Sequence, residues 1–297
     1  MVVIVAEKSD VCAQRTAEAI VHMKGLPPIF IDTTSLALGL RLAWRAHGAN
    51  GTIGFDSREV AIAEVTGVLY RGCGRAADFR LDASDRRFAE GEISGALIGL
   101  FTALPCPVVN SPVALAARIL PFGSAKMRAQ ISALGFQTPD VLVTSDLEEG
   151  RLFFEESDQG ALLRLARSVS AVCLPVGREG VRRIADGIVD SPVMIVREPS
   201  GCRLQLFVVG EHVISAAKDG SGVLRTVAPP SELLCRRLSR LTHLLQYDFA
   251  FVQLTGDVVL DVNPLPSVEA CDEGLQRELA ALLAMHLAGG DNLQGRI

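Results

Sequence analysis

The sequence has few aromatic side chains and no excess of positive charge. It contains two Tyr, one Trp and 12 Phe among 297 residues, and its formal net charge is -5. Proteins that bind nucleic acids combine a basic surface stripe with aromatic side chains on which bases stack. The composition therefore argues against a nucleic-acid partner.

Paired cysteines and long apolar runs are also missing. The seven cysteines are scattered, odd in number and include no C-x-x-C pair, which argues against a disulfide framework or a zinc site and fits reduced thiols. The most apolar stretch, residues 96–109, is shorter than a membrane span and contains prolines. The start, MVVIVAEKSD, has no basic leader. We therefore predict a cytoplasmic protein with no membrane partner.

A glycine-rich phosphate loop is missing from the first strand–helix unit. Residues 2–6 form an apolar run, Ser9 is placed to cap a helix that extends to about Lys24, and residues 28–32 form a second apolar run. A dinucleotide-binding loop needs G-x-G-x-x-G after the first strand, but AEKSD contains no glycine. The sequence thus argues against dinucleotide binding at this unit.

The apolar content is high enough for a substantial core. Hydrophobic residues make up 49% of the chain and charged residues 21%, which favours two or three packed lobes. Residues 51–70 read as short strands joined by turns, and residues 86–104 as an amphipathic helix. Its inward stripe is predicted to contain Phe88, Ile93, Leu97, Leu100 and Leu104.

Residues 247–267, YDFAFVQLTGDVVLDVNPLPS, have the pattern of a β-hairpin that turns at Gly256 and Asp257. Asp261 and Asn263 stand near the end of the returning strand. Side chains two apart on a strand share a face, so their oxygens could bind a hard cation such as magnesium. The same residues also suit an ordinary turn, since Asp and Asn bond to nearby backbone and Pro ends strand pairing.

Residues 121–146, PFGSAKMRAQISALGFQTPDVLVTSD, form the second informative stretch. Ser124 is placed to cap a helix whose Ile131 and Leu134 face inward, Gly135 suits a left-handed helix end, and residues 141–144 form a strand. Further along the chain, a hairpin is predicted to turn at residues 210–211. Helices are predicted for residues 231–247, capped by Ser231, and for residues 269–287.

These stretches, in this order, resemble ATP-grasp enzymes, especially RimK-like ligases and their relatives that cyclise ribosomal peptides. The acid-x-Asn-Pro run resembles the family's metal-binding strands, and Lys126 followed by a helix, Gly-Phe-x-x-Pro and a strand resembles its nucleotide-binding lobe. The YRG of residues 70–72 and CPVVNSP of residues 106–112 resemble the end of its N-terminal domain. The resemblance extends from about Tyr70 to the final helix.

The resemblance implies an α/β (α+β) ATP-grasp fold. Residues 1–110 would form a Rossmann-like pre-ATP-grasp domain, residues 111–190 a central lobe and residues 191–297 a C-terminal lobe. It also implies an ATP-dependent carboxylate–amine ligase that uses Mg²⁺, forms an acyl phosphate, and acts on small-molecule or peptide carboxylates and amines. A homodimer is expected from the resemblance alone.

Site residues follow from the same resemblance. Lys126 would contact the nucleotide phosphates, and Arg197 and Glu198 lie at the hinge that holds the nucleoside. Asp261 and Asn263 would bind metal together with Gln253, which stands where the family has a bridging aspartate. Lys218 and Arg225 flank Asp219, which replaces a family arginine near the transferred phosphate, and are the predicted catalytic cations.

Several family positions are substituted. Leu174 stands where a second lysine binds phosphate, so a charge-assisted contact is missing there. Arg178, or Arg182 and Arg183 nearby, could compensate, although such arginines more often form a solvated helix face. Arg203 and Gln205 occupy a usual Asp-x-Arg. Two hypotheses stay open: a divergent ligase, or a pseudoenzyme that kept the fold as a nucleotide-binding or partner subunit.

Overall fold

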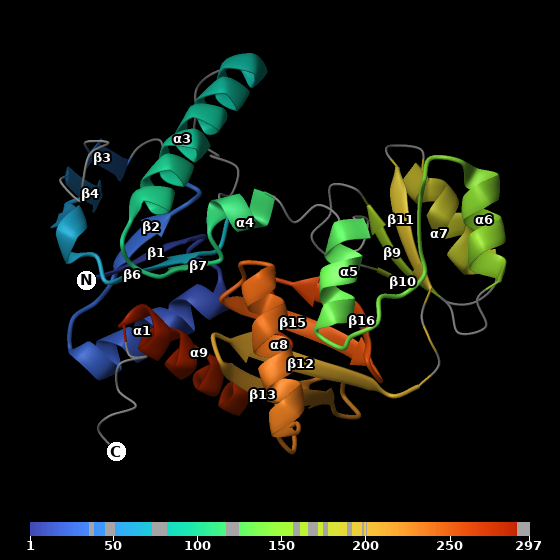
Figure 1. The fold of residues 1–297 in the computed structure, drawn as a ribbon. Coiled ribbons are helices and arrows are strands. Elements are labelled where there is room, and N and C mark those ends of the chain that lie inside the picture. Colours follow the sequence, from blue (N-terminus) through green and yellow to red (C-terminus); the bar gives the residue numbers. More distant parts are fainter. Residues whose placement is uncertain are drawn as a thin grey trace.

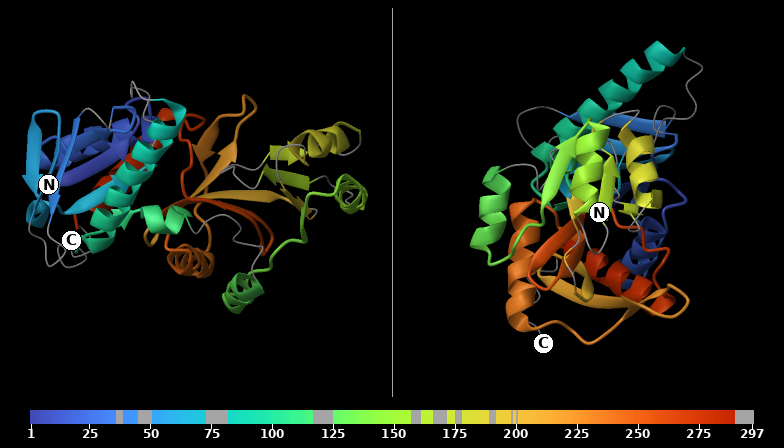
Figure 2. Two further views of the ribbon diagram at one scale, coloured as in Figure 1. Left: turned by 90° about the horizontal axis from the view of Figure 1, so that it is seen from above. Right: turned by 90° about the vertical axis from the view of Figure 1, so that its right-hand side faces the viewer.

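The computed structural model describes residues 1–35, 39–44, 51–72, 82–116, 125–156, 161–165, 172–174, 178–188, 192–197, 199 and 201–289. They form three parts in a row, with the C-terminal lobe between the N-terminal domain and the central lobe (Figure 1 and Figure 2). Within these ranges no helix is both long and apolar enough to cross a bilayer.

The N-terminal domain is built on a parallel sheet with the strand order β2-β1-β6-β7. Its strands are β1 (Val2–Ala6), β2 (Ile29–Asp32), β6 (Gly67–Tyr70) and β7 (Val108–Val109), and α1 (Val11–Lys24) connects the first two. The predicted strand–helix–strand opening is therefore confirmed. The predicted cap is wrong by one residue: Asp10, not Ser9, caps α1, because its carboxylate accepts the Ala13 N–H at 2.8 Å.

A long helix, α3 (Ala83–Ala103), covers one face of this sheet next to a small antiparallel sheet. That sheet consists of β3 (Leu40–Trp44), β4 (Gly51–Phe55) and β5 (Arg58–Ala61), followed by η1 (Ile62–Glu64). Leu97 and Leu100 of the predicted stripe are buried, whereas Phe88 is 71% exposed. The prediction for Phe88 is wrong because the first half of α3 extends beyond the sheet (Figure 1).

The central lobe is an antiparallel sheet with the order β10-β9-β11-β8. Its elements are β8 (Val141–Thr144), α6 (Leu147–Glu155), β9 (Ala161–Leu165), β10 (Val172–Leu174), α7 (Arg178–Ile188) and β11 (Val193–Arg197). Alternate residues of β11 face α6 and α7 on one side and the C-terminal lobe on the other. Because β11 pairs with both β8 and β9, this sheet continues to Arg197, beyond the boundary expected at residue 190.

The C-terminal lobe holds a five-stranded sheet with the order β14-β13-β12-β15-β16. Its strands are β12 (Arg203–Val209), β13 (His212–Lys218), β14 (Leu224–Thr226), β15 (Phe249–Thr255) and β16 (Val258–Asn263). The helices α8 (Glu232–Leu244) and α5 (Ala125–Ala133) cover one face. Both predicted hairpins, the Ser231 cap and the left-handed backbone of Gly135, φ 82°, are confirmed.

The last helix, α9 (Glu273–Leu287), packs against the first helix of the chain, α1. It is shorter than predicted because Asp272 caps it, accepting the Leu275 N–H at 2.9 Å. One core cluster combines α9 with α1, with Val2, Ile4 and Ala6 of β1, and with the second face of the C-terminal sheet. The N-terminal domain thus shares its core with the C-terminal lobe. The short helix α4 (Pro112–Ala116) follows β7.

Gly67→Ala should destabilise the protein by about 1–3 kcal/mol, the usual range for overpacking a well-packed core. A Cβ at Gly67 would lie 2.9 Å from the Leu287 Cα and overlap the Leu287 carbonyl, where α9 ends on β6. Chemical denaturation measures the loss. Gly91→Ala on α3 is the control, because nothing lies within 4 Å of a Cβ there and alanine favours helix. Equal stability of the two variants would contradict this account of the α9 contact.

Candidate functional site

A row of polar side chains crosses the C-terminal sheet. Gln205 on β12 lies directly opposite Gln253 on β15, and Gln253 lies directly opposite Asp261 on β16. Asn263 is two residues beyond Asp261, opposite Phe251. Because cross-strand partners and residues two apart share a face, the predicted metal residues Asp261, Asn263 and Gln253 are brought together on one face.

A β-bulge sets which way β16 presents Asp261. The pairing register shifts between Gln253 and Leu254, and Val259 and Val262, three residues apart, both lie in the core under α5 and α8. A regular strand would point these two valines to opposite faces. Bulges commonly redirect a side chain in this way. This one leaves Asp261 and Asn263 on the face away from α5 and α8.

The central lobe packs beside this polar row. Leu260, next to Asp261, contacts Met194 and Val196 of β11, and Asp261 is only 6% exposed. Ligand pockets favour such junctions between domains. The junction of β11 and β16 is therefore the candidate nucleotide site.

Asn263 also forms a turn. Its Oδ1 accepts the Leu265 N–H at 3.0 Å, which is the turn interaction that the sequence left open. The bond orients the carboxamide without using both lone pairs of its oxygen. Since the described residues supply only this one donor to Oδ1, one lone pair is left for a metal ion.

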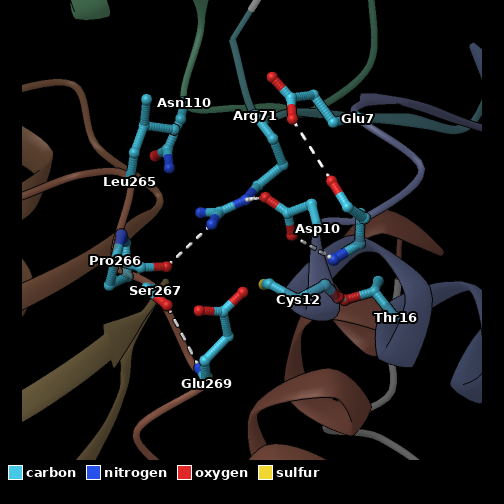
Figure 3. Close-up of polar contacts among 12 residues, drawn as sticks. Glu7, Asp10, Cys12, Thr16, Arg71, Asn110, Leu265, Pro266, Ser267 and Glu269 are labelled. Atoms are coloured by element: carbon cyan, nitrogen blue, oxygen red, sulfur yellow. Dashed lines mark hydrogen bonds and ion pairs between the residues drawn. The ribbon is translucent and has the colours of Figure 1, made fainter. Parts of the chain in front are cut away.

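Two residues of the N-terminal domain fix the segment that follows Asn263. Asn110, fully buried with φ 58°, donates from Nδ2 to the Pro264 carbonyl and accepts the Phe249 N–H at 3.2 Å. Arg71 donates from Nη2 to the Pro266 carbonyl at 2.8 Å and pairs with Asp10 at 3.0 Å (Figure 3). Arg71 lies in the YRG of residues 70–72 and Asn110 in the CPVVNSP of residues 106–112, the two stretches that resemble the end of the family's N-terminal domain. The sequence assigned no role to either residue.

The predicted phosphate contacts are only partly within the described residues. Lys126 lies in the first turn of α5 and Leu174 at the end of β10, but their side chains are outside the description, as is Glu198 altogether. Arg178 is the exposed first residue of α7. Arg182 forms ion pairs with Glu179 and Asp186, at 3.8 and 4.0 Å, as expected of a solvated helix face.

Arg197, predicted to contact nucleotide, is bound to the central lobe. Its guanidinium donates to the Phe153 carbonyl at 3.1 Å, lies 4.1 Å from the centre of the Phe153 ring, and pairs with Glu156 and, at 3.6 Å, with Asp140. These contacts tie α6 to the end of β11. The Arg197 side chain could contact a nucleotide only by breaking these contacts. The backbone near Arg197 is therefore better placed than the side chain to form hydrogen bonds with a nucleotide.

The predicted catalytic cations lie on either side of the turn between β13 and β14: Lys218 is the last residue of β13 and Arg225 lies within β14. Asp219 organises this turn: it accepts the Ser221 hydroxyl at 2.6 Å and the Arg225 Nε–H at 2.8 Å. These bonds, from Ser221 and then Arg225, hold the pKa of Asp219 well below its usual range. Arg225 is thereby neutralised, whereas Lys218 is exposed. Lys218 is therefore the better placed of the two to supply positive charge.

The described residues offer few charged ligands for a metal ion. Over the part of the chain that the structure describes, no three or more His, Cys, Asp or Glu side chains form a group able to hold a metal ion. Asp261 would thus provide the carboxylate, with amide oxygens of Asn263 and Gln253 beside it. This oxygen set fits magnesium in type but is low in charge.

Comparison with solved structures confirms the predicted ATP-grasp fold. The macrocyclase MdnC of Microcystis aeruginosa MRC, solved with precursor peptide MdnA, matches with a TM-score of 0.75 and 16% identity over 97% of this chain and 100% of that chain. The ATP-grasp ligase PsnB, solved with precursor peptide PsnA2 and AMPPNP, matches with a TM-score of 0.73 and 18% identity over 98% of each chain. A RimK domain protein of Sphaerobacter thermophilus DSM 20745 has a TM-score of 0.56 and 15% identity over 95% and 97%. No protein-family model or curated protein matches the sequence.

Proposed function

We propose that the protein is an ATP-dependent carboxylate–amine ligase that uses magnesium and acts on a peptide. The observation that carries this proposal is the shared face of Asp261, Asn263 and Gln253 at the junction of β11 and β16. It lies in a chain whose ATP-grasp neighbours include PsnB solved with a minimal precursor, Mg and ADP. Neighbours solved with precursor peptides support the peptide substrate.

The reaction would proceed in two transfers. A carboxylate oxygen of the substrate attacks the γ-phosphorus of ATP, ADP leaves, and an acyl phosphate forms. The amine nitrogen then attacks the acyl carbon, phosphate leaves, the nitrogen loses a proton, and an amide results. Catalysis of this kind rests on positioning and on neutralising phosphoryl oxygens. Lys126 and Arg178 would face the phosphates, Asp261 and Asn263 would hold magnesium, and Lys218 would face the acyl group.

A second candidate function is a pseudoenzyme that binds nucleotide or a partner without turnover. Its support is the low charge of the site: Asp261 is flanked by the neutral Gln253, and Leu174 stands at a position where a family lysine binds phosphate. Charge on phosphoryl oxygens must be neutralised in the transition state as well as in the ground state. Turnover therefore distinguishes the two functions better than ATP binding does.

Leu174→Lys tests between them. In a pseudoenzyme the new ammonium should tighten ATP binding by about 1.5–3 kcal/mol, or tenfold and more, without creating turnover. In a ligase Arg178 substitutes for the lysine, so Arg178→Ala should lower phosphate release more than it weakens ATP binding. Calorimetry gives the affinities, and phosphate release with candidate peptides gives turnover.

Arg182→Ala is the matched control, because Arg182 pairs with its own helix surface. It should leave both affinity and turnover unchanged. If Arg178→Ala and Arg182→Ala change phosphate release and ATP affinity equally, Arg178 does not substitute for the missing lysine. No ATP binding in wild type or any variant would defeat the ligase proposal.

The location and assembly of the protein stay predictions. A cytoplasmic location is supported by the five cysteines in the described part of the chain, which are all free thiols: Cys12, Cys106, Cys202, Cys235 and Cys271. Burial raises the pKa of the Cys271 thiol to about 11, so this thiol stays protonated and unreactive at neutral pH. The homodimer rests on the family resemblance.

A further inference from the structure

Two cationic residues lie next to each other on the C-terminal sheet. Arg203 is the first residue of β12, and Lys218 is the last residue of β13. These strands are antiparallel, with Gln205 opposite Ala216. Continuing this pairing by two residues along each strand places Arg203 opposite Lys218. Because residues two apart on a strand share a face, both cations project from the face that carries Gln205.

That face is the one away from α5 and α8. Leu206 lies in the core under those two helices. Phe207 and Ile214, which lie opposite each other on β12 and β13, belong instead to the core shared with α1 and α9. Side chains alternate along a strand, so Arg203 is on the side of Phe207. The two cations therefore share a face with the polar row and with Asp261.

The polar row offers one carboxylate. The residue directly opposite Asp261 is Gln253, the next one across the sheet is Gln205, and Asn263 follows two residues along β16. These three side chains are neutral. Two metal ions in one site stand about 3.5–4 Å apart and repel each other, so they need several negative ligands. One carboxylate with neutral amide oxygens suits a single magnesium ion.

Arg203 and Asp261 are close enough to contact one nucleotide. β15 alone separates β12 from β16 in the sheet (Figure 1). Two strand spacings and two residues amount to about 10 Å across the sheet and about 7 Å along it, which a triphosphate and an arginine side chain together can bridge. Lys218 is one strand further away. Like charges directly opposite each other on a sheet repel, and an anion bound to both cations offsets that repulsion.

We infer that the site holds one magnesium ion, and that Arg203 and Lys218 bind the phosphoryl oxygens that a second ion would otherwise neutralise. Asp261 holds the ion at one end of the phosphate chain, and the two cations contact the chain from β12 and β13. The inference rests on the proposed function for ATP as the ligand, but it concerns binding and does not require turnover.

Counting metal ions tests the first part of the inference. Manganese(II) accepts the same oxygen ligands as magnesium, and its free ion is measured by electron paramagnetic resonance. It is titrated into the full chain with one equivalent of a non-hydrolysable ATP analogue. Wild type should bind one ion per chain. Gln253→Asp should bind two, because the new carboxylate lies directly opposite Asp261.

Gln246→Asp is the control for the metal count. It adds a carboxylate at an exposed position after α8, away from the polar row, and should bind one ion. Two ions in wild type, or one ion in Gln253→Asp, would overturn the inference. If Gln253→Asp does not fold, the count in wild type still decides.

Arg203→Gln and Lys218→Gln test the second part. Affinity for the analogue with magnesium should fall about tenfold for the half-buried Arg203 and about threefold for the exposed Lys218. Adenosine has no phosphate groups, so its affinity should not change. A merely structural role would weaken adenosine and analogue alike. Arg236→Gln, which removes an exposed cation on α8, should change neither affinity.

Unchanged analogue affinity in either variant, or an equal loss of adenosine affinity, would overturn the inference. Phosphate release with candidate peptides is measured separately. One bound ion and the expected losses of affinity without turnover reject the ligase alone. Turnover with two bound ions rejects this inference alone, and no nucleotide binding rejects both.

Discussion

Asp261→Ala should make ATP binding independent of magnesium. Asp261 is the carboxylate of the polar row on the C-terminal sheet, and its neighbours Asn263 and Gln253 contribute only neutral oxygens. Magnesium prefers carboxylate oxygen and dehydrates reluctantly, so two amide oxygens alone should not retain it beside ATP. Calorimetric titration of ATP with and without magnesium, on wild type and variant, measures the effect.

Asp257→Ala is the control for this experiment. Asp257 lies on the turn of the same hairpin, is 59% exposed and pairs with Arg237 at 2.8 Å. Removing it takes one carboxylate from the hairpin but none from the polar row, so the magnesium dependence should persist. If wild type and Asp261→Ala respond identically to magnesium, the metal assignment is wrong.

Asn110→Ala should lower the free energy of unfolding by about 2–6 kcal/mol. The substitution leaves the Pro264 carbonyl and the Phe249 N–H without their buried partner, and each unsatisfied buried group costs about 1–3 kcal/mol. It also places alanine at φ 58°, a left-handed conformation that asparagine tolerates better. Urea denaturation followed by circular dichroism gives the change in stability.

Gln246→Ala separates backbone conformation from hydrogen bonding. Gln246 has nearly the same left-handed backbone, φ 59°, but is exposed. Its replacement should change stability by less than about 0.5 kcal/mol, as is usual for surface positions. A comparable loss in both variants would show that Asn110 acts through its backbone alone and does not hold the segment after Asn263.

The fold was largely predictable wherever a single element carries its own pattern. Apolar residues at every second position predicted the β15–β16 hairpin, and the spacing of Asp261 and Asn263 predicted their common face, which the register confirms. The predicted boundary at residue 190 separates β11 from β8 and β9, with which it pairs. The burial of β11 on both faces gives no alternation from which its partner strands can be deduced.

The site was less predictable, because its contacts connect residues far apart in the chain. Asn110 bonds to a residue 154 positions away and Arg71 to one 195 positions away, and no local periodicity records such distances. The bulge beside Gln253 depends on the pairing of β15 with β16, which neither strand's own sequence specifies. Arg197 ends β11, and the direction of its side chain depends on α6, which the sequence around Arg197 does not specify.

The position of α9 affects how the chain is made. The face of β1 formed by Val2, Ile4 and Ala6 packs in one core with α1 and with a helix that ends at Leu287, so part of its cover comes from a segment that is synthesised much later. At about 5–20 residues per second, that delay is roughly 15–60 s. During this time the apolar surface that α9 will cover is open to other nascent chains or to chaperones. We therefore expect a change in translation speed to alter the expression yield. It should alter the thermodynamic stability of the folded protein less.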